Sequence, residues 1–162
     1  MRYTALGMLL VLTMISGGCG VYSFSSAGKA PFSSIAVEQF ENKTPEYQLA
    51  DRLTEALVDA FIQDNTVPVK DMSRAEAVLI GSVNDYRRDP YTYDQADVVK
   101  EYVVKVTVHV KVVKNGSEDV YWEENFFAQG IYNADTETED DGQTRAIELL
   151  TSTILDRTTK SW

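Results

Sequence analysis

The chain has 162 residues, of which 15 are lysine or arginine and 25 are aspartate or glutamate, so its formal net charge is −10 at pH 7. A surface this acidic repels nucleic acid over most of its area, which argues against a nucleic-acid-binding protein. One cysteine and one histidine cannot supply the nitrogen and sulfur ligands of a common zinc site. The length fits one domain with a core of its own.

The first 20 residues have the layout of a bacterial export signal. Arg2 precedes an apolar run from Ala5 to Ile15, which is shorter than the roughly 20 apolar residues that a transmembrane helix needs. The small residues Ser16-Gly17-Gly18 then lead to Cys19. This segment resembles the lipobox of bacterial lipoproteins, although Ser16 stands where that motif usually has an aliphatic residue.

The lipobox resemblance predicts a signal peptide at residues 1–18 and a covalent lipid, with acyl chains such as palmitate, on Cys19. The next residue is Gly20 and not aspartate, which by the same resemblance implies the periplasmic side of the outer membrane. A membrane anchor through the lipid would follow. The alternative is an ordinary secretory signal followed by an incidental or buried cysteine.

Residues 19–31 are rich in serine, glycine and alanine, and they predict a tether to a single domain over residues 32–162. Tyr22 and Phe24 in the tether either dock on the domain or lie at the bilayer surface. A first strand is expected at Ser34–Phe40. A helix is expected at about Pro45–Asp64, with Thr44 as its N-cap and Asn65 as its stop.

The rest of the domain predicts three more strands and one more helix. Strands are expected at Ala77–Tyr86, Val98–Val113 and about Glu118–Tyr132, with a short edge piece at Val67–Val69 and a loop at Arg87–Asp94. A last helix should run to about Arg157 and bury a stripe that consists of Ala146, Ile147, Leu150 and Ile154. This order indicates an α+β two-layer sandwich, in which two helices pack on one face of a four-stranded, mainly antiparallel sheet.

The strand at Val98–Val113 alternates clearly. Its apolar face carries Tyr102 and the valines at even positions from 104 to 112, and its polar face carries Glu101, Lys105, Thr107, His109 and Lys111. A three-residue turn at Lys114-Asn115-Gly116, with Gly116 left-handed, would pair Val108 with Trp122 and Lys111 with Asp119. That register places Glu124 opposite Val106, which suggests a bulge or a position near the sheet edge.

The segment from Asn133 to Asp141 contains five acidic residues, the last of which is Asp141 itself. We interpret this segment as a solvated loop that runs into the first turn of a helix, where the helix dipole favours negative charge. Calcium binding is the alternative, but the order of the side chains matches no coordination loop.

No constellation of catalytic residues is present. The chain has no G-x-S-x-G, no glycine-rich phosphate loop and no H-E-x-x-H. Glu123 and Glu124 are adjacent on a strand, so they point to opposite faces and cannot act on one substrate as a pair. We therefore expect no catalytic residue, no metal and no cofactor other than the lipid on Cys19, and we predict that the protein is not an enzyme.

Several short motifs in this order resemble the LptE-like lipopolysaccharide-assembly lipoproteins. They are Gly18-Cys19-Gly20-Val21-Tyr22-Ser23-Phe24, Ile35-Ala36-Val37, Phe40-Glu41-Asn42-Lys43-Thr44, Leu53-Thr54-Glu55-Ala56-Leu57 and Tyr86-Arg87-Arg88-Asp89-Pro90-Tyr91. The resemblance implies a small outer-membrane lipoprotein without catalytic activity. It would act as plug and assembly partner of an LptD-like β-barrel and would touch lipopolysaccharide.

Cationic side chains are the candidates for contact with lipid A phosphates. We name Arg87, Arg88, Lys100 and Lys105, because guanidinium and ammonium groups bind phosphate. The alternative is that each of them is simply a solvated charge on a loop or a strand face and binds no ligand. The polar strand face from Lys105 to Lys111 could match a polar barrel lumen. A free periplasmic-facing lipoprotein that binds a small or peptide ligand is the competing function.

Overall fold

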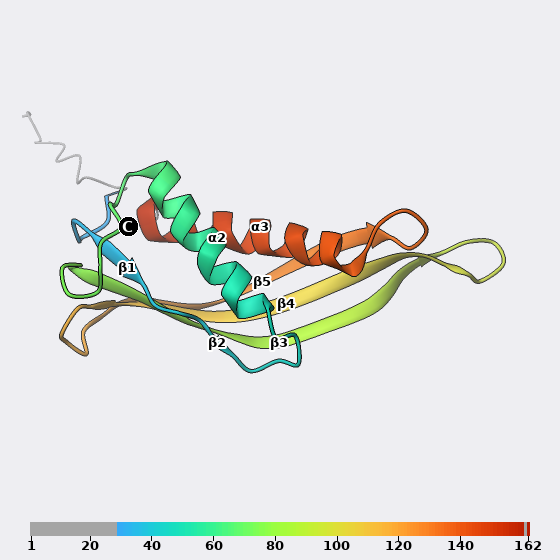
Figure 1. Cartoon of the computed structure of the whole chain (residues 1–162), viewed down its shortest axis with the longest axis horizontal. Coiled ribbons are helices and arrows are strands. Elements are labelled where there is room, and N and C mark those ends of the chain that lie inside the picture. Colours follow the sequence, from blue (N-terminus) through green and yellow to red (C-terminus); the bar gives the residue numbers. More distant parts are fainter. Residues whose placement is uncertain (1–28, 161) are drawn as a thin grey trace, which may run out of the picture.

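A computed structural model describes residues 29–160 and residue 162. Its elements, in chain order, are β1 (Ile35–Val37), β2 (Glu41–Asn42), α2 (Leu49–Asp64), β3 (Ala77–Tyr93), β4 (Val99–Lys114), β5 (Val120–Asn133) and α3 (Glu139–Thr159) (Figure 1). The predicted signal peptide, Cys19 and most of the predicted tether lie outside the described residues. In the described part of the chain, no helix is long and apolar enough to cross a membrane.

The sheet has five strands and is mixed. β3, β4 and β5 form an antiparallel meander, and both β1 and β2 pair with β3 in parallel. The α+β class is confirmed, but the strand predicted at Ser34–Phe40 is shorter, because β1 covers only Ile35–Val37. A further strand that was not predicted, β2, follows at Glu41–Asn42, so four strands become five. Parallel neighbours need a crossover, and α2 supplies it.

Both helices lie on the same face of the sheet, so the predicted two-layer arrangement is confirmed (Figure 1). The even-numbered side chains of β4 point toward the helices, and Val104 to Val112 are completely buried. α2 covers them with a stripe that consists of Leu49, Leu53, Leu57 and Phe61. α3 contributes the predicted stripe of Ala146, Ile147, Leu150 and Ile154.

The predicted start of the first helix is wrong by four residues. Asn42 accepts hydrogen bonds from the backbone and hydroxyl of Thr44 and donates one to the Glu46 carbonyl, so a local turn replaces the expected N-cap. α2 therefore begins at Leu49. It ends as predicted, because Asn65 adopts the left-handed conformation with φ of 53°.

The acidic segment leads into α3, as predicted. Thr138 is the N-cap, and Thr138 and Asp141 form a reciprocal capping box. Glu139, Asp140 and Asp141 occupy the first turn of the helix. These acidic side chains therefore lie where the helix dipole stabilises them.

The predicted loop at Arg87–Asp94 is wrong, because β3 continues through Tyr93. The extension forms the long β3–β4 hairpin, which projects beyond the helices (Figure 1). Pro90 is tolerated because β2 pairs with β3 only at Ser82 and Val83, which leaves the later part of β3 at the sheet edge. The pairing of β3 with β4 shifts register between Val83 and Asp85 and again on either side of Thr92.

The predicted register between β4 and β5 is also wrong. Trp122 pairs with Val112 and Glu123 pairs with Lys111, because the connection is longer than three residues and a bulge follows at Val112 and Val113. The alternation of faces survives, since the shift is even. Gly116 is left-handed as predicted, with φ of 75°. Glu124 lies on edge strand β5, where Arg157 of α3 is its ion-pair partner at 2.5 Å.

Candidate functional site

The four cations predicted to contact phosphate lie on both sides of the sheet. Arg87 pairs with Lys105 across β3 and β4, so these two share the face that no helix covers. Arg88 pairs with Val104 and therefore points to the helix side. Lys100 shares that side by alternation along β4. The structure thus forms two pairs of cations and not one cluster of four.

We call the uncovered side of the sheet the open face. It carries Asp85, Arg87 and Asp89 on β3, Lys105, Thr107, His109 and Lys111 on β4, and Glu123, Asn125 and Phe127 on β5. The predicted polar face of β4 is therefore confirmed as one surface. Phe127 lies opposite Thr107 and is 55 % exposed, so the centre of this polar face also presents an aromatic ring.

Both β-strand cations predicted to contact phosphate on the open face have a carboxylate partner. Lys105 donates to Asp89 at 2.9 Å, and Arg87 donates to Asp85 at 3.0 Å. The hydrogen bond from Lys105 lowers the pKa of Asp89 below its ordinary value, so this carboxyl group is ionised at neutral pH. The lone histidine, His109, lies 2.9 Å from Glu123. An anionic ligand would therefore compete with neighbouring carboxylates for these cations.

Arg88 is held in an aromatic and acidic environment on the helix side. Its guanidinium lies 3.9 Å from the centre of the Tyr102 ring and donates to the Tyr132 hydroxyl at 2.6 Å. Glu139 at the start of α3 lies 3.5 Å away. These contacts use the flat shape of the group as well as its charge.

Lys100 also has an acidic partner. It donates to Asp135, which precedes α3, at 3.0 Å, and this hydrogen bond raises the pKa of Lys100 above its ordinary value. Arg88 and Lys100 thus connect the β3–β4 hairpin to the segment at the start of α3. Both side chains therefore join separate elements of the fold.

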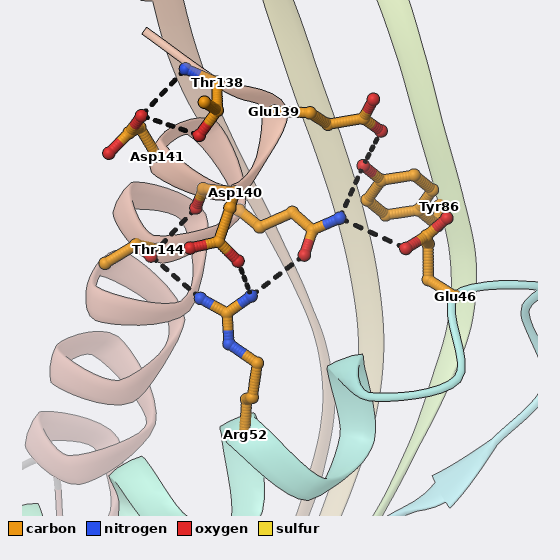
Figure 2. A network of polar contacts seen from close by, with 9 residues as sticks. Glu46, Arg52, Tyr86, Thr138, Glu139, Asp140, Asp141 and Thr144 are labelled. Atoms are coloured by element: carbon orange, nitrogen blue, oxygen red, sulfur yellow. Dashed lines mark hydrogen bonds and ion pairs between the residues drawn. The ribbon is translucent and has the colours of Figure 1, made fainter.

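A polar network joins α2, β3 and the start of α3, as Figure 2 shows. Arg52 donates to Asp140 at 2.6 Å, to Gln143 at 3.0 Å and to Thr144 at 2.8 Å. Gln143 in turn donates to Tyr86, whose hydroxyl donates to Glu139 at 2.5 Å. Burial and the bond to Glu139 raise the pKa of Tyr86 well above its ordinary value, so its phenol stays protonated.

Sequence reasoning missed this network, because its members come from three distant segments. The one available signal in the sequence was Arg52, which is a cation among the acidic residues Asp51 and Glu55 of the predicted helix. The network contains no nucleophile beside a base. Among the described residues, no group of three histidine, cysteine, aspartate or glutamate side chains could hold a metal ion.

Solved structures share this fold at low sequence identity. Protein XCC0632 from Xanthomonas campestris aligns with a TM-score of 0.60 and 13% identity, over 82% of this chain and 87% of that one. Protein CT253 from Chlamydia trachomatis gives 0.56 and 12%, over 78% and 95%. PelC from Paraburkholderia phytofirmans, solved as a dodecamer, gives 0.52 and 15%, over 83% and 94%. These similarities establish the fold alone.

A search of curated proteins gives no match. The model of one protein family, LptE, described as lipopolysaccharide-assembly, matches residues 32–158. The match begins just before β1 and ends one residue before the end of α3, so it includes all five strands, α2 and all but the last residue of α3. The resemblance seen in the short motifs is thereby confirmed, and the chain belongs to the LptE family of lipopolysaccharide-assembly proteins.

Proposed function

We propose that the protein is a non-enzymatic outer-membrane lipoprotein of lipopolysaccharide transport, which acts as plug and assembly partner of an LptD-type β-barrel. The observation that carries this proposal is the family match over residues 32–158, which covers nearly the whole folded domain. A lipid on Cys19 would anchor the domain at the periplasmic side of the outer membrane.

The shape of the domain is compatible with a plug that is held at one end. The first described residues and the C-terminus lie together at one end of the long axis, and the β3–β4 hairpin lies at the other (Figure 1). The rings of Phe32 and Trp162 are 5.6 Å apart, which fixes the two chain ends side by side. An anchor before residue 29 would therefore leave the hairpin free to reach into a partner.

We propose the open face as the surface that meets the barrel. The lumen of an outer-membrane barrel is polar, and the open face presents paired charges such as Lys105 with Asp89 and Arg87 with Asp85. Such pairs are polar without a large net charge. Phe127 would add apolar contact at the centre of this surface, where aromatic side chains contribute most to protein interfaces.

Within the same proposal, Arg87 and Lys105 are the pair that contacts lipopolysaccharide. They lie opposite each other on adjacent strands of one exposed face, so two phosphate oxygens could reach both. Arg88 and Lys100 are the second pair, and their contacts to Tyr132, Glu139 and Asp135 would have to rearrange first.

Co-purification tests the partnership. A C-terminally tagged protein extracted in detergent should bring down a β-barrel of much larger mass, and Phe127→Lys should reduce that yield. Ile62→Lys is the matched control, because Ile62 is similarly exposed (58 %, against 55 % for Phe127) but lies on α2. A tagged protein that brings down no barrel would instead support a free lipoprotein with a small or peptide ligand.

Lipopolysaccharide binding is tested separately with two double variants. Arg87→Ala with Lys105→Ala should weaken binding more than Arg88→Ala with Lys100→Ala, and thermal unfolding of both variants controls for loss of structure. Equal binding by the wild-type protein and both variants would show that none of the four cations is a contact residue.

The lipid anchor is tested by metabolic labelling with palmitate. The wild-type chain should take up label and fractionate with the outer membrane, and Cys19→Ala should do neither. Label on the Cys19→Ala protein would contradict the lipidation site.

A further inference from the structure

The outer side of the helix layer has a groove between α2 and α3, which we call the interhelical groove. Two adjoining hollows of about 290 and 460 Å³ form it, and they share Ala56, Asp59 and Glu148 in their linings. The two helices run in the same direction along the groove, because Arg52 lies beside Thr144 at one end and Gln63 lines the same hollow as Leu155 at the other.

Each helix contributes one regular stripe to the groove. The lining side chains follow the spacing of three and four residues that marks one helix face. On α2 they are Arg52, Glu55, Ala56, Asp59, Ala60 and Gln63, and on α3 they are Thr144, Ile147, Glu148, Thr151, Ser152 and Leu155. Each stripe extends over eleven residue steps, which corresponds to about 17 Å of helix. The groove is therefore about as long as three helical turns.

The floor of the groove is apolar, and small side chains make it deep. Ala56 and Ala60 are small and partly buried, and Ile147 and Leu155 lie across from them. Small residues let another backbone approach closely, and the ridges of a helix pack into such a channel between two others. A helix bound in the groove would add a third helix to the layer formed by α2 and α3.

The rims of the groove are acidic. Arg145 acts on Glu148 at longer range, but the guanidinium of Arg145 is bound by Glu137. Glu55, Asp59 and Glu148 are exposed, and none of them forms an ion pair with a residue that the structure describes. Arg52 does not neutralise them, because its guanidinium is bound by Asp140. This differs from the open face, where Arg87 and Lys105 are each paired with a carboxylate. An occupant of the groove would therefore be cationic.

Thr151 belongs to the lining of the groove, and its hydroxyl is enclosed and has no partner within the described residues. The residue as a whole is only 8 % exposed. Buried hydroxyl groups are normally satisfied, and a threonine in a helix usually bonds to the carbonyl four residues earlier. Thr158 of the same helix does so, to Ile154 at 2.6 Å.

From these observations we propose that the interhelical groove binds a cationic amphipathic helix of a protein partner. Apolar side chains on one face of that helix would pack over Ala56 and Ala60, and lysine or arginine side chains at its edges would meet Glu55, Asp59 and Glu148. The groove lies on the opposite side of the molecule from the open face, so this partner contact is separate from the barrel contact proposed above.

The test uses the full chain in phosphatidylcholine nanodiscs, with empty nanodiscs as the blank. The probe is a fluorescein-labelled helical peptide with leucine on one face and lysine at its edges, and the matched probe has glutamate in place of each lysine. Fluorescence anisotropy at low salt, where screening is weak, measures both affinities. The lysine probe should bind and the glutamate probe should not.

Two triple variants then locate the site. Glu55→Gln with Asp59→Asn and Glu148→Gln should weaken binding of the lysine probe about tenfold, as three exposed charge pairs together imply. Glu38→Gln with Asp97→Asn and Glu118→Gln removes the same charge from exposed positions outside the groove, and it should change the affinity by less than about twofold. Ala60→Tyr, which fills the floor, should abolish binding in a protein that thermal unfolding shows to be folded.

Each other result overturns the proposal. Equal weakening by both triple variants would mean general attraction to an acidic protein. Equal binding of the two probes, retained binding by Ala60→Tyr, or no binding of the lysine probe would each show that the groove does not accept a cationic helix.

Discussion

Gly130 of β5 lies directly beneath the backbone of Gly142 in α3. A methyl group added to Gly130 would come within 1.8 Å of the Gly142 carbonyl oxygen and 3.0 Å of the Ala146 nitrogen. Neither atom belongs to a side chain that could move aside. The start of α3 therefore rests on the sheet at a contact that only glycine permits, and this contact positions Glu139 and Asp140 for the polar network at the start of α3.

Gly130→Ala should destabilise the protein by about 3 kcal/mol, because α3 must move away from β5 to admit the methyl group. Denaturant unfolding followed by circular dichroism measures the change. Gln129→Ala is the control, since Gln129 is exposed on the same strand, and it should change stability by less than about 0.5 kcal/mol. A Gly130→Ala protein as stable as the control would contradict the close contact.

The alternation along β4 predicted the burial of the valines at even positions from 104 to 112, because a strand with one covered face repeats every two residues. It did not predict that Val103, on the other face, is buried as well. The pairing of β5 was not predictable in the same way. Several registers keep valines opposite apolar residues, and the choice depends on the length of the connection after Lys114. The unfavourable position of Glu124 was a correct sign of the sheet edge, but its partner, Arg157, lies 33 residues away.

The second half of β3 was mistaken for a loop for a physical reason. Between Arg87 and Tyr93 the strand projects beyond the helices, so neither face is fully buried and no alternation of apolar residues marks it. The contacts of the candidate site residues were also not predictable from local sequence patterns. The partners of Arg88 and Lys100 are Glu139 and Asp135, which only the tertiary fold brings near. Gly130, within a strand, was a usable signal of close backbone approach.

Thr151→Val should increase the stability of the isolated protein by about 1 kcal/mol, because it removes a buried hydroxyl that has no partner. Thr158→Val is the matched control. Its hydroxyl is bonded to the Ile154 carbonyl, so this change should be neutral or destabilising. Thermal unfolding of both variants distinguishes them, and a loss of stability in Thr151→Val would mean that its hydroxyl is satisfied.

Arg52→Met should destabilise the protein by about 1 kcal/mol, because the guanidinium bridges α2 to the first turns of α3 and much of Asp140 is exposed to solvent. Arg74→Met removes an exposed ion pair with Asp71 that joins no separate elements. It should change stability by less than about 0.5 kcal/mol. Denaturant unfolding tests both, and equal effects would mean that Arg52 does not hold the helices together.

The capping box of α3 should make stability depend on pH in the acid range. Hydrogen bonds from the backbone and hydroxyl of Thr138 lower the pKa of Asp141 below its ordinary value of 3.8. The folded state therefore binds this proton less readily than the unfolded state, and the ionised carboxylate stabilises the fold at pH values above 3.8. This contribution should disappear as the pH falls through the lowered pKa of the folded state.

Asp141→Asn keeps the shape of the side chain and removes the charge, so it isolates this effect. The variant should be less stable than the wild-type protein at neutral pH, and the difference in unfolding free energy should shrink as the pH falls below 3.8. Asp97→Asn, at an exposed position in the β3–β4 turn, is the control. Urea unfolding at a series of pH values gives the comparison. A difference between Asp141→Asn and wild type that stays constant down to the lowest pH would show that the charge of Asp141 does not stabilise α3.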